Sequence, residues 1–557
     1  MIAMDKFAVA RALDEISRYL ELGESNRFKA LAFERAARSL RSLDREPADL
    51  IATGDLLKMP GIGKATAAIV EELVSGGSTR YLDDLRKQYP PGIFELLRVP
   101  SLGLKKIGML YETLGIGSLD ELEAAARAGK LTKLPGFGAK TQQKILDGIE
   151  KARRRESQFL LPVGLEVGEA IRAQLAAIDD VVDAEVSGSV RRRLEVIRNV
   201  NVVVATRAPE RVIALLPRIV ENVEALDETT VKGLANNEID VLFHFAKPAD
   251  FGVQLLVTTG SRDFVEAFPG KLRGKSEHDV FKNAGIAWVE PERRETADDL
   301  KRKRPHKLVE MSDLRGTFHV HTTFSDGRNT VLEMLDAARQ RGFEYVGLSD
   351  HSKAAYYAGG LTEARLVEQQ AEIETQRPRV APLRVFRGTE ADILPDGSID
   401  YGAETLAKFD FVIASVHSRF NMDKDEMTER ILRALDDRHV TFLGHLTGRL
   451  LLSRDGYTMD FDKVFERAGA RGVMIEINGN PNRLDLDWRL IQRALDRGVT
   501  FSINPDAHST HEYNALVTGT WVARKGGLSP KEIFNTRDAD EVAEHFAGRA
   551  HAVRPYR

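Results

Sequence analysis

Histidine and carboxylate residues follow apolar, strand-like runs at several points between residues 319 and 508, and this pattern constrains the fold more than any other feature of the chain. The runs at residues 345–348, 411–414 and 501–503 each lead into a short polar island, and helical stretches lie between the islands. Strand, then polar ligand, then helix is the order of a β/α barrel with its chemistry at the carboxyl ends of the strands. The islands contribute nine ligand-type residues: His319, His321, Asp326, His351, Glu390, His417, His445, Asp506 and His508.

These nine side chains supply enough nitrogen and oxygen donors for a site with several metal ions. A single histidine is more often a packed or solvated side chain, but that explanation does not extend to a series of nine. The chain has no cysteine, so disulfides and thiolate ligands are excluded, and His, Asp and Glu remain as the strong ligands. Imidazoles mixed with carboxylates accept Mn²⁺, Zn²⁺ or Fe²⁺.

The series resembles the ligand pattern of the PHP (polymerase and histidinol phosphatase) domain, whose nine positions all occur here in the same order. The resemblance implies a distorted seven-stranded β/α barrel that holds up to three divalent ions, with Mn²⁺ or Zn²⁺ expected. It also implies three ligand sets: His319, His321, Glu390 and Asp506 for one ion, Glu390, His417 and His445 for a second, and Asp326, His351 and His508 for a third.

Hydrolysis of a phosphoester by metal-activated water needs no protein nucleophile, which agrees with the absence of cysteine. Arg449 and Arg483 are candidate phosphate clamps because a planar guanidinium matches two phosphate oxygens, although each could instead form a salt bridge at the barrel rim. Asp350 could orient the neighbouring His351 imidazole or cap the next helix. The predicted catalytic residues are His319, His321, Glu390, Asp506, Arg449 and Arg483.

At 557 residues the chain is expected to contain several domains, because single hydrophobic cores rarely grow beyond about 250–300 residues. No apolar run approaches the roughly 18 residues of a membrane helix, and the first residues lack the layout of a signal peptide. A cytoplasmic protein without a membrane partner is therefore expected. The net charge of −4 gives no general attraction for nucleic acid, so DNA binding has to come from local basic patches.

A short template occurs three times in the first 155 residues. Each copy has a proline, a glycine (a serine in the middle copy), an apolar residue, a second glycine and a nearby lysine, and leads into a predicted helix. Glycines let a ligand approach the backbone closely, and the free amides of a helix N-terminus accept a phosphate. The template resembles the helix-hairpin-helix motif of DNA-repair proteins; three ordinary glycine turns are the alternative. The expected DNA contacts are Gly61, Gly63, Lys64, Gly103, Lys105, Gly136, Gly138 and Lys140.

The middle of the chain resembles the palm of family X DNA polymerases, with a Gly-Ser turn followed by two polar-patterned strands. By that resemblance Gly188, Ser189 and Arg192 hold a nucleoside triphosphate, and the three metal-binding aspartates of the family fall at Asn199, Asn201 and Asp240. Two of the three carboxylates are absent, so neither Mg²⁺ binding at this palm nor DNA synthesis is expected. The alternative is that a nearby carboxylate, Glu195 or Glu238, takes their place.

Two further positions depart from the family pattern. Val257 and Thr258 stand where two aromatic residues usually precede the Thr-Gly-Ser turn. Ile69 stands near the position of the family's Schiff-base lysine, and isoleucine has no amine to act as nucleophile. Deoxyribose-phosphate lyase chemistry is therefore not expected either.

The predicted fold is multidomain, with helix-hairpin-helix helical domains, an α/β nucleotidyltransferase-like palm and a C-terminal distorted (β/α)7 PHP barrel. The expected divisions are a helical domain with the first hairpin (1–88), a fingers-like domain with two hairpins (89–155), the palm (156–245), a short thumb-like domain (246–300), a linker (301–313) and the PHP barrel (314–557). This order is that of bacterial and archaeal family X DNA polymerases with a C-terminal PHP domain.

Three functions are compatible with these features. The favoured one is a metal-dependent DNA phosphoesterase that acts in base excision repair. It would be a 3′→5′ exonuclease that also processes abasic sites or 3′-phosphates. The other domains would bind gapped, nicked or 3′-ended DNA. The second is an active gap-filling polymerase with an attached exonuclease, which the two asparagines disfavour. The third is a small-molecule phosphatase of the histidinol-phosphate type, which would have no use for three DNA-backbone hairpins.

Overall fold

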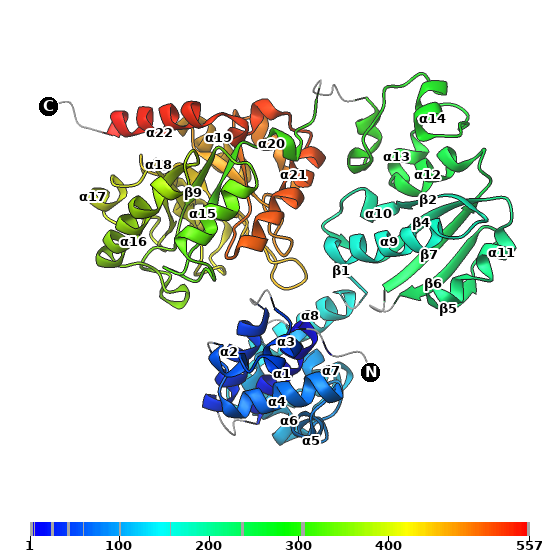
Figure 1. The fold of residues 1–557 in the computed structure, drawn as a ribbon, viewed down its shortest axis with the longest axis horizontal. Coiled ribbons are helices and arrows are strands. Elements are labelled where there is room, and N and C mark those ends of the chain that lie inside the picture. Colours follow the sequence, from blue (N-terminus) through cyan, green and yellow to red (C-terminus); the bar gives the residue numbers. More distant parts are fainter. Residues whose placement is uncertain are drawn as a thin grey trace. The chain divides into compact units, whose positions relative to one another are not determined.

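The computed structural model describes Met4 and residues 6–23, 27–41, 45–59, 61–99, 102–155, 157–235, 239–301 and 307–553. The chain divides into two compact units, Met1–Glu156 and Ser157–Arg557 (Figure 1). This division falls beside the predicted end of the fingers-like domain; the finer boundaries stay predictions. None of the described helices is both long and apolar enough to cross a membrane.

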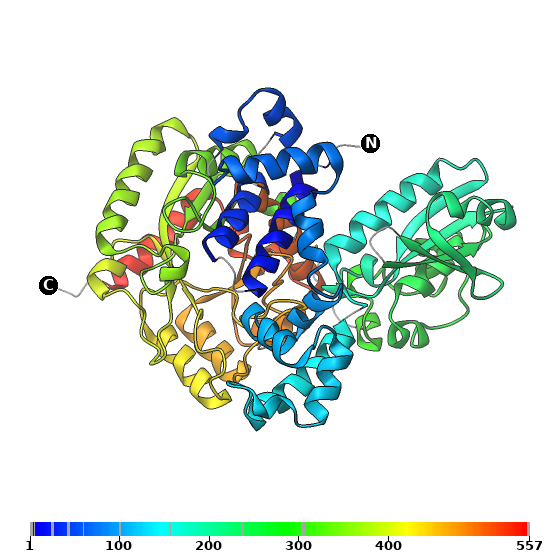
Figure 2. The same ribbon diagram turned by 90° about the horizontal axis from the view of Figure 1, so that it is seen from below.

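The first unit is helical throughout its described residues, as Figure 2 shows in blue and cyan. Val9, Leu13, Ile16 and Leu20 recur at helical spacing, and all four are buried in the core of this unit. The α-helices are α1 (Lys6–Leu22), α2 (Arg27–Arg41), α3 (Pro47–Ala52), α4 (Lys64–Gly76), α5 (Arg80–Arg86), α6 (Leu104–Leu114), α7 (Leu119–Arg127) and α8 (Ala139–Arg155). Short 3₁₀ turns η1 (Leu56–Lys58), η2 (Ile93–Arg98) and η3 (Leu131–Lys133) precede α4, α6 and α8.

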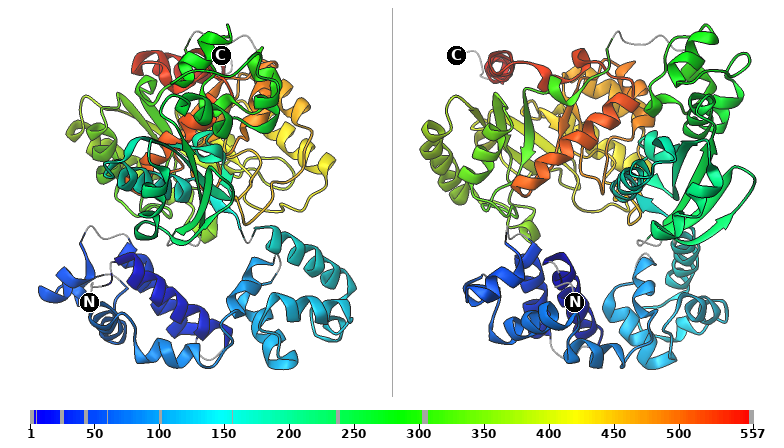
Figure 3. Two further views of the ribbon diagram at one scale, coloured as in Figure 1. Left: turned by 90° about the vertical axis from the view of Figure 1, so that its right-hand side faces the viewer. Right: turned by 45° about the vertical axis from the view of Figure 1, so that its right-hand side comes forward.

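The second unit contains a five-stranded sheet in the order β2-β4-β7-β6-β5, which is labelled in Figure 1 and drawn from two further sides in Figure 3. Its strands are β2 (Val181–Ser187), β4 (Asn199–Thr206), β5 (Glu221–Ala225), β6 (Thr230–Ala235) and β7 (Ile239–Ala246), and only the central pair β4 and β7 is parallel. Helix α9 (Leu161–Ala176) packs against β2 and β4. It approaches closely because Gly164 and Gly168 face Ile197 and Val186, which a Cβ at those positions would meet at 2.2 and 3.0 Å.

A small helical cluster follows the sheet, in the region predicted to be a shortened thumb. It contains α12 (Phe251–Thr259), α13 (Arg262–Glu266) and α14 (Glu277–Asn283), packed around Leu256, Phe264 and Phe281. Residues 302–306 of the predicted linker, with its basic run, lie outside the described residues.

The rest of the second unit is a parallel barrel, which confirms the predicted fold. Seven strands are hydrogen-bonded in chain order from β8 to β14, and a parallel bridge between Val320 and Ala507 joins the first strand to the end of the last. The strands are β8 (Gly316–Val320), β9 (Tyr345–Leu348), β10 (Arg384–Asp392), β11 (Phe411–Ser415), β12 (Phe442–Leu443), β13 (Met474–Asn478) and β14 (Phe501–Asn504). The helices are α15 (Val331–Gln340), α16 (Glu363–Gln376), α17 (Ala403–Leu406), α18 (Lys424–Asp436), α19 (Phe461–Arg471), α20 (Trp488–Leu495), α21 (Ala515–Lys525) and α22 (Ala539–Val553).

Aromatic rings fill the amino-terminal end of the barrel. Phe318, Phe411, Phe442, Phe534 and Phe546 form one buried cluster there. The glycines Gly347 and Gly388 make room for the Phe411 ring, which a Cβ at either position would meet at 2.6 Å or less. Because this end is filled with apolar side chains, the polar chemistry of the barrel is confined to the carboxyl ends of its strands.

Candidate functional site

All nine predicted ligands lie at or just beyond the carboxyl ends of barrel strands, where they come together in one cluster. His319, His445 and Asp506 adopt positive φ angles of +61°, +22° and +53°. Such conformations cost energy in residues with a side chain and gather at functional sites. The backbone bonds from His321 N to Ala507 O and from Ala507 N to His319 O hold the first and last ligand segments together.

Glu390 lies at the centre of the cluster and is 1% exposed. Its Oε1 lies 2.9 Å from His445 Nε2 and 3.2 Å from His417 Nε2. Its Oε2 lies 3.0 Å from His351 Nδ1 and 3.3 Å from His319 Nε2. His321 Nε2 lies 3.6 Å from the same Oε2 atom. One carboxylate therefore lies within 4 Å of five imidazoles, the arrangement expected of a bridging ligand.

Asp506 and Asp326 complete the cluster on either side of His321 and His508. Asp506 Oδ1 lies 3.4 Å from His319 Nε2 and 3.5 Å from His321 Nε2. Asp326 Oδ1 lies 3.3 Å from His508 Nε2 and 3.6 Å from His351 Nε2. Asp326 is 37% exposed, so this side of the cluster faces solvent.

The ligand atoms form four groups, and within each group all atoms lie within 4.8 Å of one another. The groups are His321, Asp326, His351 and His508; His319, Glu390 and His445; His319, His321 and Asp506; and His351, Glu390 and His417. These groups overlap with the three predicted ligand sets without matching them one for one. His351 approaches Glu390 as well as Asp326, and His445 lies with His319. The assignment of each ligand to a particular ion stays a prediction.

The donors of this cluster fit divalent cations. His319 Nε2, both ring nitrogens of His321, His351 Nδ1, His445 Nδ1 and Glu390 Oε2 are buried atoms that make no hydrogen bond to any residue that the structure describes. Buried polar atoms are rarely left without a partner, because burial without one costs free energy. Unpartnered imidazole and carboxylate lone pairs that converge on one volume are what Mn²⁺ or Zn²⁺ would require.

The pKa values of these groups show strong electrostatic coupling. Burial opposes ionisation of Glu390 and Asp506, but the surrounding histidines, led by His319, hold both carboxyl pKa values well below their usual range. Burial and the neighbouring His508 and His351 lower the pKa of His321 to about 3. The carboxylates are therefore ionised and His321 is neutral, as metal ligation requires. Burial opposes protonation of His319, His417 and His508, but the neighbouring carboxylates raise the pKa of His319, bring that of His417 to about 10 and bring that of His508 to about 9. A divalent ion bound there would therefore displace protons from these three rings.

Two buried carboxylates that the sequence reading missed hold the ligand rings in place. Glu476 of β13 lies 2.5 Å from His319 Nδ1 and accepts a hydrogen bond of 2.7 Å from His445 N. Asp392 at the end of β10 accepts a hydrogen bond from His417 Nδ1. Carboxylates in this position fix the tautomer and the orientation of a ligating imidazole.

Asp350 has neither of the roles considered for it. Its oxygens accept hydrogen bonds from Thr322 N, Ser325 Oγ and Gln369 Nε2 at 2.6–2.7 Å. They do not bond to His351 and do not cap a helix. Asp350 instead fixes the loop that follows His321 and carries Asp326.

The two candidate arginines differ. Arg483 Nε lies 3.3 Å from Asp506 Oδ2, so its guanidinium borders the cluster. Arg449 instead bonds to Arg483 O at 2.9 Å, to Leu484 O and to Asp487 Oδ2 at 2.6 Å. These contacts favour a role in positioning the loop of Arg483 and do not favour a direct phosphate clamp.

The three hairpin templates share one geometry across their described residues. Ile62, Leu102 and Phe137 are buried, while the glycines on either side and the following lysines are exposed. Gly61 and Gly136 have φ angles of +79° and +80°, which glycine adopts without strain. A Cβ at Gly103, Gly136 or Gly138 would meet no atom within 4 Å, so the surface there is open to a ligand. Pro60, Pro100 and Ser101 lie outside the described residues.

Gly63, Gly103 and Gly138 come directly before α4, α6 and α8, so each hairpin leads into a helix N-terminus with its free amides. Lys64, Lys105 and Lys140 stand within two residues of them and are exposed. The predicted phosphate contacts of each hairpin are thus brought together at one helix N-terminus.

The palm positions also come together, but their side chains bind one another. Asn199 and Asp240 are partners on the parallel strands β4 and β7. Asn201 Nδ2 donates to Asn199 Oδ1 at 2.8 Å, and Asn201 Oδ1 lies 2.9 Å from His244 Nε2. Lys232 Nζ lies 2.9 Å from Asp240 Oδ2. An ammonium group thus stands beside the remaining carboxylate.

Of the predicted triphosphate contacts, Arg192 is engaged elsewhere. Gly188 has a φ of +65° and packs on Asn201, which a Cβ would meet at 2.6 Å. The side chain of Ser189, the next residue, makes no hydrogen bond to another described residue. Arg192 Nη1 donates to Thr259 O at 2.6 Å, and its Nε donates to Glu295 Oε1 at 3.1 Å.

Glu195, considered as a replacement metal ligand of the palm, does not fill that role. Its carboxylate pairs with Arg489 at 2.5 Å and accepts a hydrogen bond from Trp488 Nε1 at 3.3 Å, both on α20 of the barrel. Glu238, the other residue considered, lies outside the described residues.

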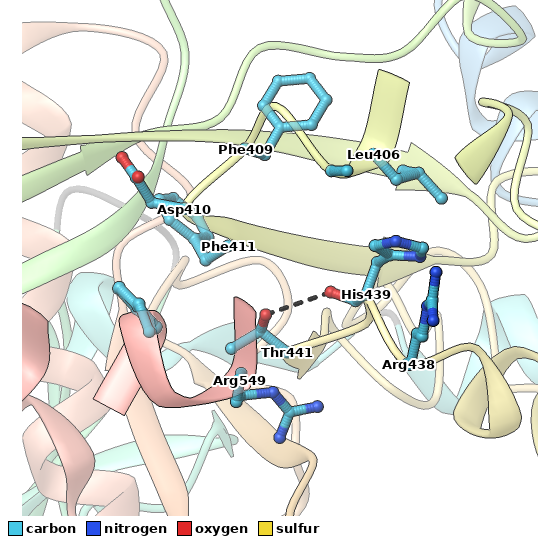
Figure 4. Close-up of a pocket in the computed structure, with 10 residues that line it drawn as sticks. Leu406, Phe409, Asp410, Phe411, Arg438, His439, Thr441 and Arg549 are labelled. Carbon is cyan, nitrogen blue, oxygen red and sulfur yellow. Dashed lines mark hydrogen bonds between the residues drawn. The ribbon is translucent and has the colours of Figure 1, made fainter. Parts of the chain in front are cut away.

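A separate cavity of about 110 Å³ lies at the amino-terminal end of the barrel (Figure 4). Leu406, Phe409 and Phe411 line it together with His439, whose Nδ1 contacts Asp437 Oδ1 at 2.8 Å. The nine-ligand cluster lies at the other ends of the strands, so this cavity is not part of it.

Comparison with known proteins agrees with this architecture. Residues 4–79 match the helix-hairpin-helix domain, residues 93–151 the SAM-like helix-hairpin-helix tandem, and residues 317–480 the PHP domain. The chain is therefore a PHP-domain protein with helix-hairpin-helix modules, a class in which the barrel depends on metal.

The family follows from a full-length similarity. The chain is 33% identical over 566 residues to the DNA polymerase/3′-5′ exonuclease PolX of Bacillus subtilis (strain 168), covering 97% of this chain and 99% of that protein. It belongs to the PolX-type family X DNA polymerases with a C-terminal PHP domain. Shorter similarities are to probable phosphatases of Thermoanaerobacter sp. (strain X514), 23% identical over 41% of this chain and 92% of the relative, and of Clostridium acetobutylicum, 27% identical over 42% and 93%.

Proposed function

We propose that this protein is a metal-dependent DNA phosphoesterase that removes nucleotides from 3′ ends, with abasic-site and 3′-phosphate processing as related reactions of the same centre. The observation that carries the proposal is the buried cluster around Glu390, in which imidazole and carboxylate atoms come within 4.8 Å of one another and several of them make no hydrogen bond to a described residue. The name of the Bacillus relative includes a 3′-5′ exonuclease, which supports the same reaction here.

Each part of the cluster has a proposed task. Divalent ions bound there supply Lewis acidity and bring the pKa of a bound water toward neutrality. Glu390, at the centre of the cluster, would hold metal together with the surrounding imidazoles, and Glu476 and Asp392 hold the imidazoles of His319 and His417 in a ligating orientation. Arg483 borders Asp506 and is the side chain placed to bind a phosphate oxygen.

The palm is proposed not to synthesise DNA. Nucleotidyl transfer needs two divalent ions held by anionic oxygens, and here one carboxylate remains, with the Lys232 ammonium beside it. Arg192 is bonded to Thr259 and Glu295, so the predicted triphosphate contact is also engaged. We propose that the palm serves as a scaffold that positions DNA for the barrel.

The helix-hairpin-helix modules are proposed to supply DNA affinity that does not depend on sequence. Backbone amides and lysines at helix N-termini bind phosphates, which carry no sequence information. The intended substrates are gapped, nicked or 3′-ended DNA.

Two other functions are the alternatives to this proposal. An active gap-filling polymerase is suggested by the polymerase in the name of the Bacillus relative, and the Lys232–Asp240 contact opposes it. A small-molecule phosphatase is suggested by the shorter relatives, and the two helix-hairpin-helix matches oppose it.

One gel separates the three functions. The protein is incubated with end-labelled gapped DNA and Mn²⁺, with and without deoxynucleoside triphosphates, beside the His319→Ala variant. Shortening of the 3′ strand by the wild type alone supports the proposal. Extension in both proteins would show an active polymerase, and neither shortening nor extension would favour the small-molecule phosphatase.

A further inference from the structure

A cavity of about 520 Å³ lies at the junction of the palm and the barrel, within the second unit. Its barrel residues come from the loop after β13, the loop after β14 and the first turns of α21. Both loops follow the carboxyl ends of their strands, so the cavity lies on the same face of the barrel as the nine-ligand cluster. Its volume is in the usual range for small-molecule sites.

The walls of the cavity continue directly into the cluster. Pro505 precedes the ligand Asp506, and Asn482 precedes Arg483, which borders Asp506. Glu512 accepts a hydrogen bond of 2.7 Å from the backbone nitrogen of the ligand His508. The chain therefore passes from the wall of the cavity to a ligand of the cluster, or to the bordering Arg483, within one residue.

One side of the cavity is apolar and partly flat. Its apolar residues are Pro162 and Leu165 of α9, with Pro505, Val517 and Trp521 of the barrel. The guanidinium of Arg193 lies 4.2 Å from the centre of the Trp521 ring and fixes that ring in place. Val517 is 38% exposed, which is unusual for a large aliphatic side chain on a helix that packs on the barrel.

The other side presents hydrogen-bonding groups. Asn480 Oδ1 accepts from Asn482, but Asn480 Nδ2 and Asn482 Oδ1 make no hydrogen bond to another described residue. The His511 imidazole is exposed and likewise makes none. An amide donor, an amide acceptor and an imidazole opposite an apolar wall match a planar heterocycle with polar edges.

We propose that this cavity seats the nucleobase of the 3′-terminal nucleotide while its phosphodiester lies at the metal cluster. The inference rests on the proposed DNA phosphoesterase function and names the part of the substrate that the palm helps to hold. A nucleobase has flat faces that stack on aromatic and apolar groups and an edge that bonds to amides, which are the two kinds of surface present. The palm helix α9 then has a direct task in substrate binding.

The test compares two single-stranded DNA substrates that differ only in the terminal nucleotide, one with adenine and one with a tetrahydrofuran abasic residue. For the wild type with Mn²⁺, the abasic end should raise KM about tenfold, the scale of one lost stacking contact. Val517→Phe fills the cavity without removing a core side chain. It should raise KM for the adenine end to the value for the abasic end, so that the difference between the two ends disappears. Val367→Phe, an exposed site on α16, is the matched control and should behave as the wild type.

Equal KM values for the two ends in the wild type, or a preference for adenine that survives in Val517→Phe, would overturn the proposal. If neither end is hydrolysed, the proposed function is overturned instead. A binding measurement then tests whether the cavity holds a nucleobase. Titration with dAMP should quench the fluorescence of Trp521, deoxyribose 5-phosphate should not, and Trp521→Phe should lose the signal. Equal responses to both compounds would show that no base site exists.

Discussion

Lys232 Nζ lies 2.9 Å from Asp240 Oδ2 at the edge of the palm where a polymerase of this family would bind metal. Asn201, on the neighbouring strand, bonds to both Asn199 and His244. Burial lowers the pKa of His244, so this imidazole is neutral near pH 7 and adds no positive charge. The edge is thus a set of mutually satisfied side chains with one ion pair, and it offers little to a divalent cation.

The palm should therefore not extend a primer. We expect no template-dependent product from gapped DNA with Mg²⁺ or Mn²⁺ and all four deoxynucleoside triphosphates. The assay uses His319→Ala protein, because an active exonuclease could hide slow synthesis. An extension product that depends on the template would show that a residue outside this edge completes the polymerase site.

The central position of Glu390 predicts unequal losses of metal. Glu390→Ala should abolish nucleotide release and reduce the bound metal by more than one ion per chain, because its carboxylate lies within 4 Å of five imidazoles. Asp326→Asn should lose about one ion, because among the described residues the Asp326 carboxylate lies within 4 Å of two imidazoles, those of His351 and His508. Metal content after gel filtration measures both. Asp496→Asn, on an exposed residue of the barrel, is the control, and equal losses in the first two variants would contradict the bridging role.

The buried Glu476 should tune metal affinity without contacting the metal. Glu476→Gln removes the negative charge that orients His319, and loss of such a partner typically weakens metal binding 10–100-fold. Activity should therefore fall at limiting Mn²⁺ and recover at high Mn²⁺, in contrast to Glu390→Ala. Glu466→Gln, an exposed residue on α19, should titrate as the wild type. Activity that stays low at saturating Mn²⁺ would assign Glu476 a direct part in the reaction.

The sequence was sufficient to predict the barrel and the nine ligand-type side chains that lie together in it, because several of them follow apolar runs and the order of residue types is specific. It was not sufficient for Glu476 or Asp392. Glu476 is an isolated carboxylate in the middle of the buried strand 474–478, and this placement is the feature of the sequence that could have revealed its role. Contacts such as Arg192 with Glu295, or Glu195 with Arg489, join residues 103 and 294 positions apart and have no local signature.

The hairpin lysines should contribute to DNA binding through phosphate contacts. Lys140→Ala should weaken binding to gapped DNA and reduce the slope of log Kd against log salt by about one. Lys531→Ala removes an exposed charge from the barrel and is the matched control. Binding is measured by fluorescence anisotropy between about 50 and 200 mM salt. An unchanged slope for Lys140→Ala would remove the third hairpin from the DNA contact.

The buried pair of Glu277 and Arg294 should make the thumb-like region sensitive to acid. Glu277 is buried and contacts Arg294 as well as Arg191 Nη2, the latter at 2.7 Å. Burial alone would raise the pKa of the Glu277 carboxyl, but the two guanidinium groups reverse this effect and leave the pKa below its usual range. A carboxyl with a depressed folded-state pKa stabilises the fold above its unfolded pKa of about 4.3, and this stabilisation is lost as pH falls through the folded pKa.

Glu277→Gln should therefore destabilise the region at pH 7 by about 3 kcal/mol, because it leaves the buried Arg294 without a counter-charge. The loss should shrink as pH falls below about 4, where the wild-type carboxyl is itself protonated. Urea unfolding followed by Trp288 fluorescence reports on this region, since the Trp288 ring stacks on His278 and lies 4.8 Å from the Arg294 guanidinium. Glu266→Gln breaks an exposed ion pair and should cost less than about 1 kcal/mol at either pH. A constant difference between Glu277→Gln and wild type from pH 7 to pH 3 would mean that packing, and not charge, sets the contribution of Glu277.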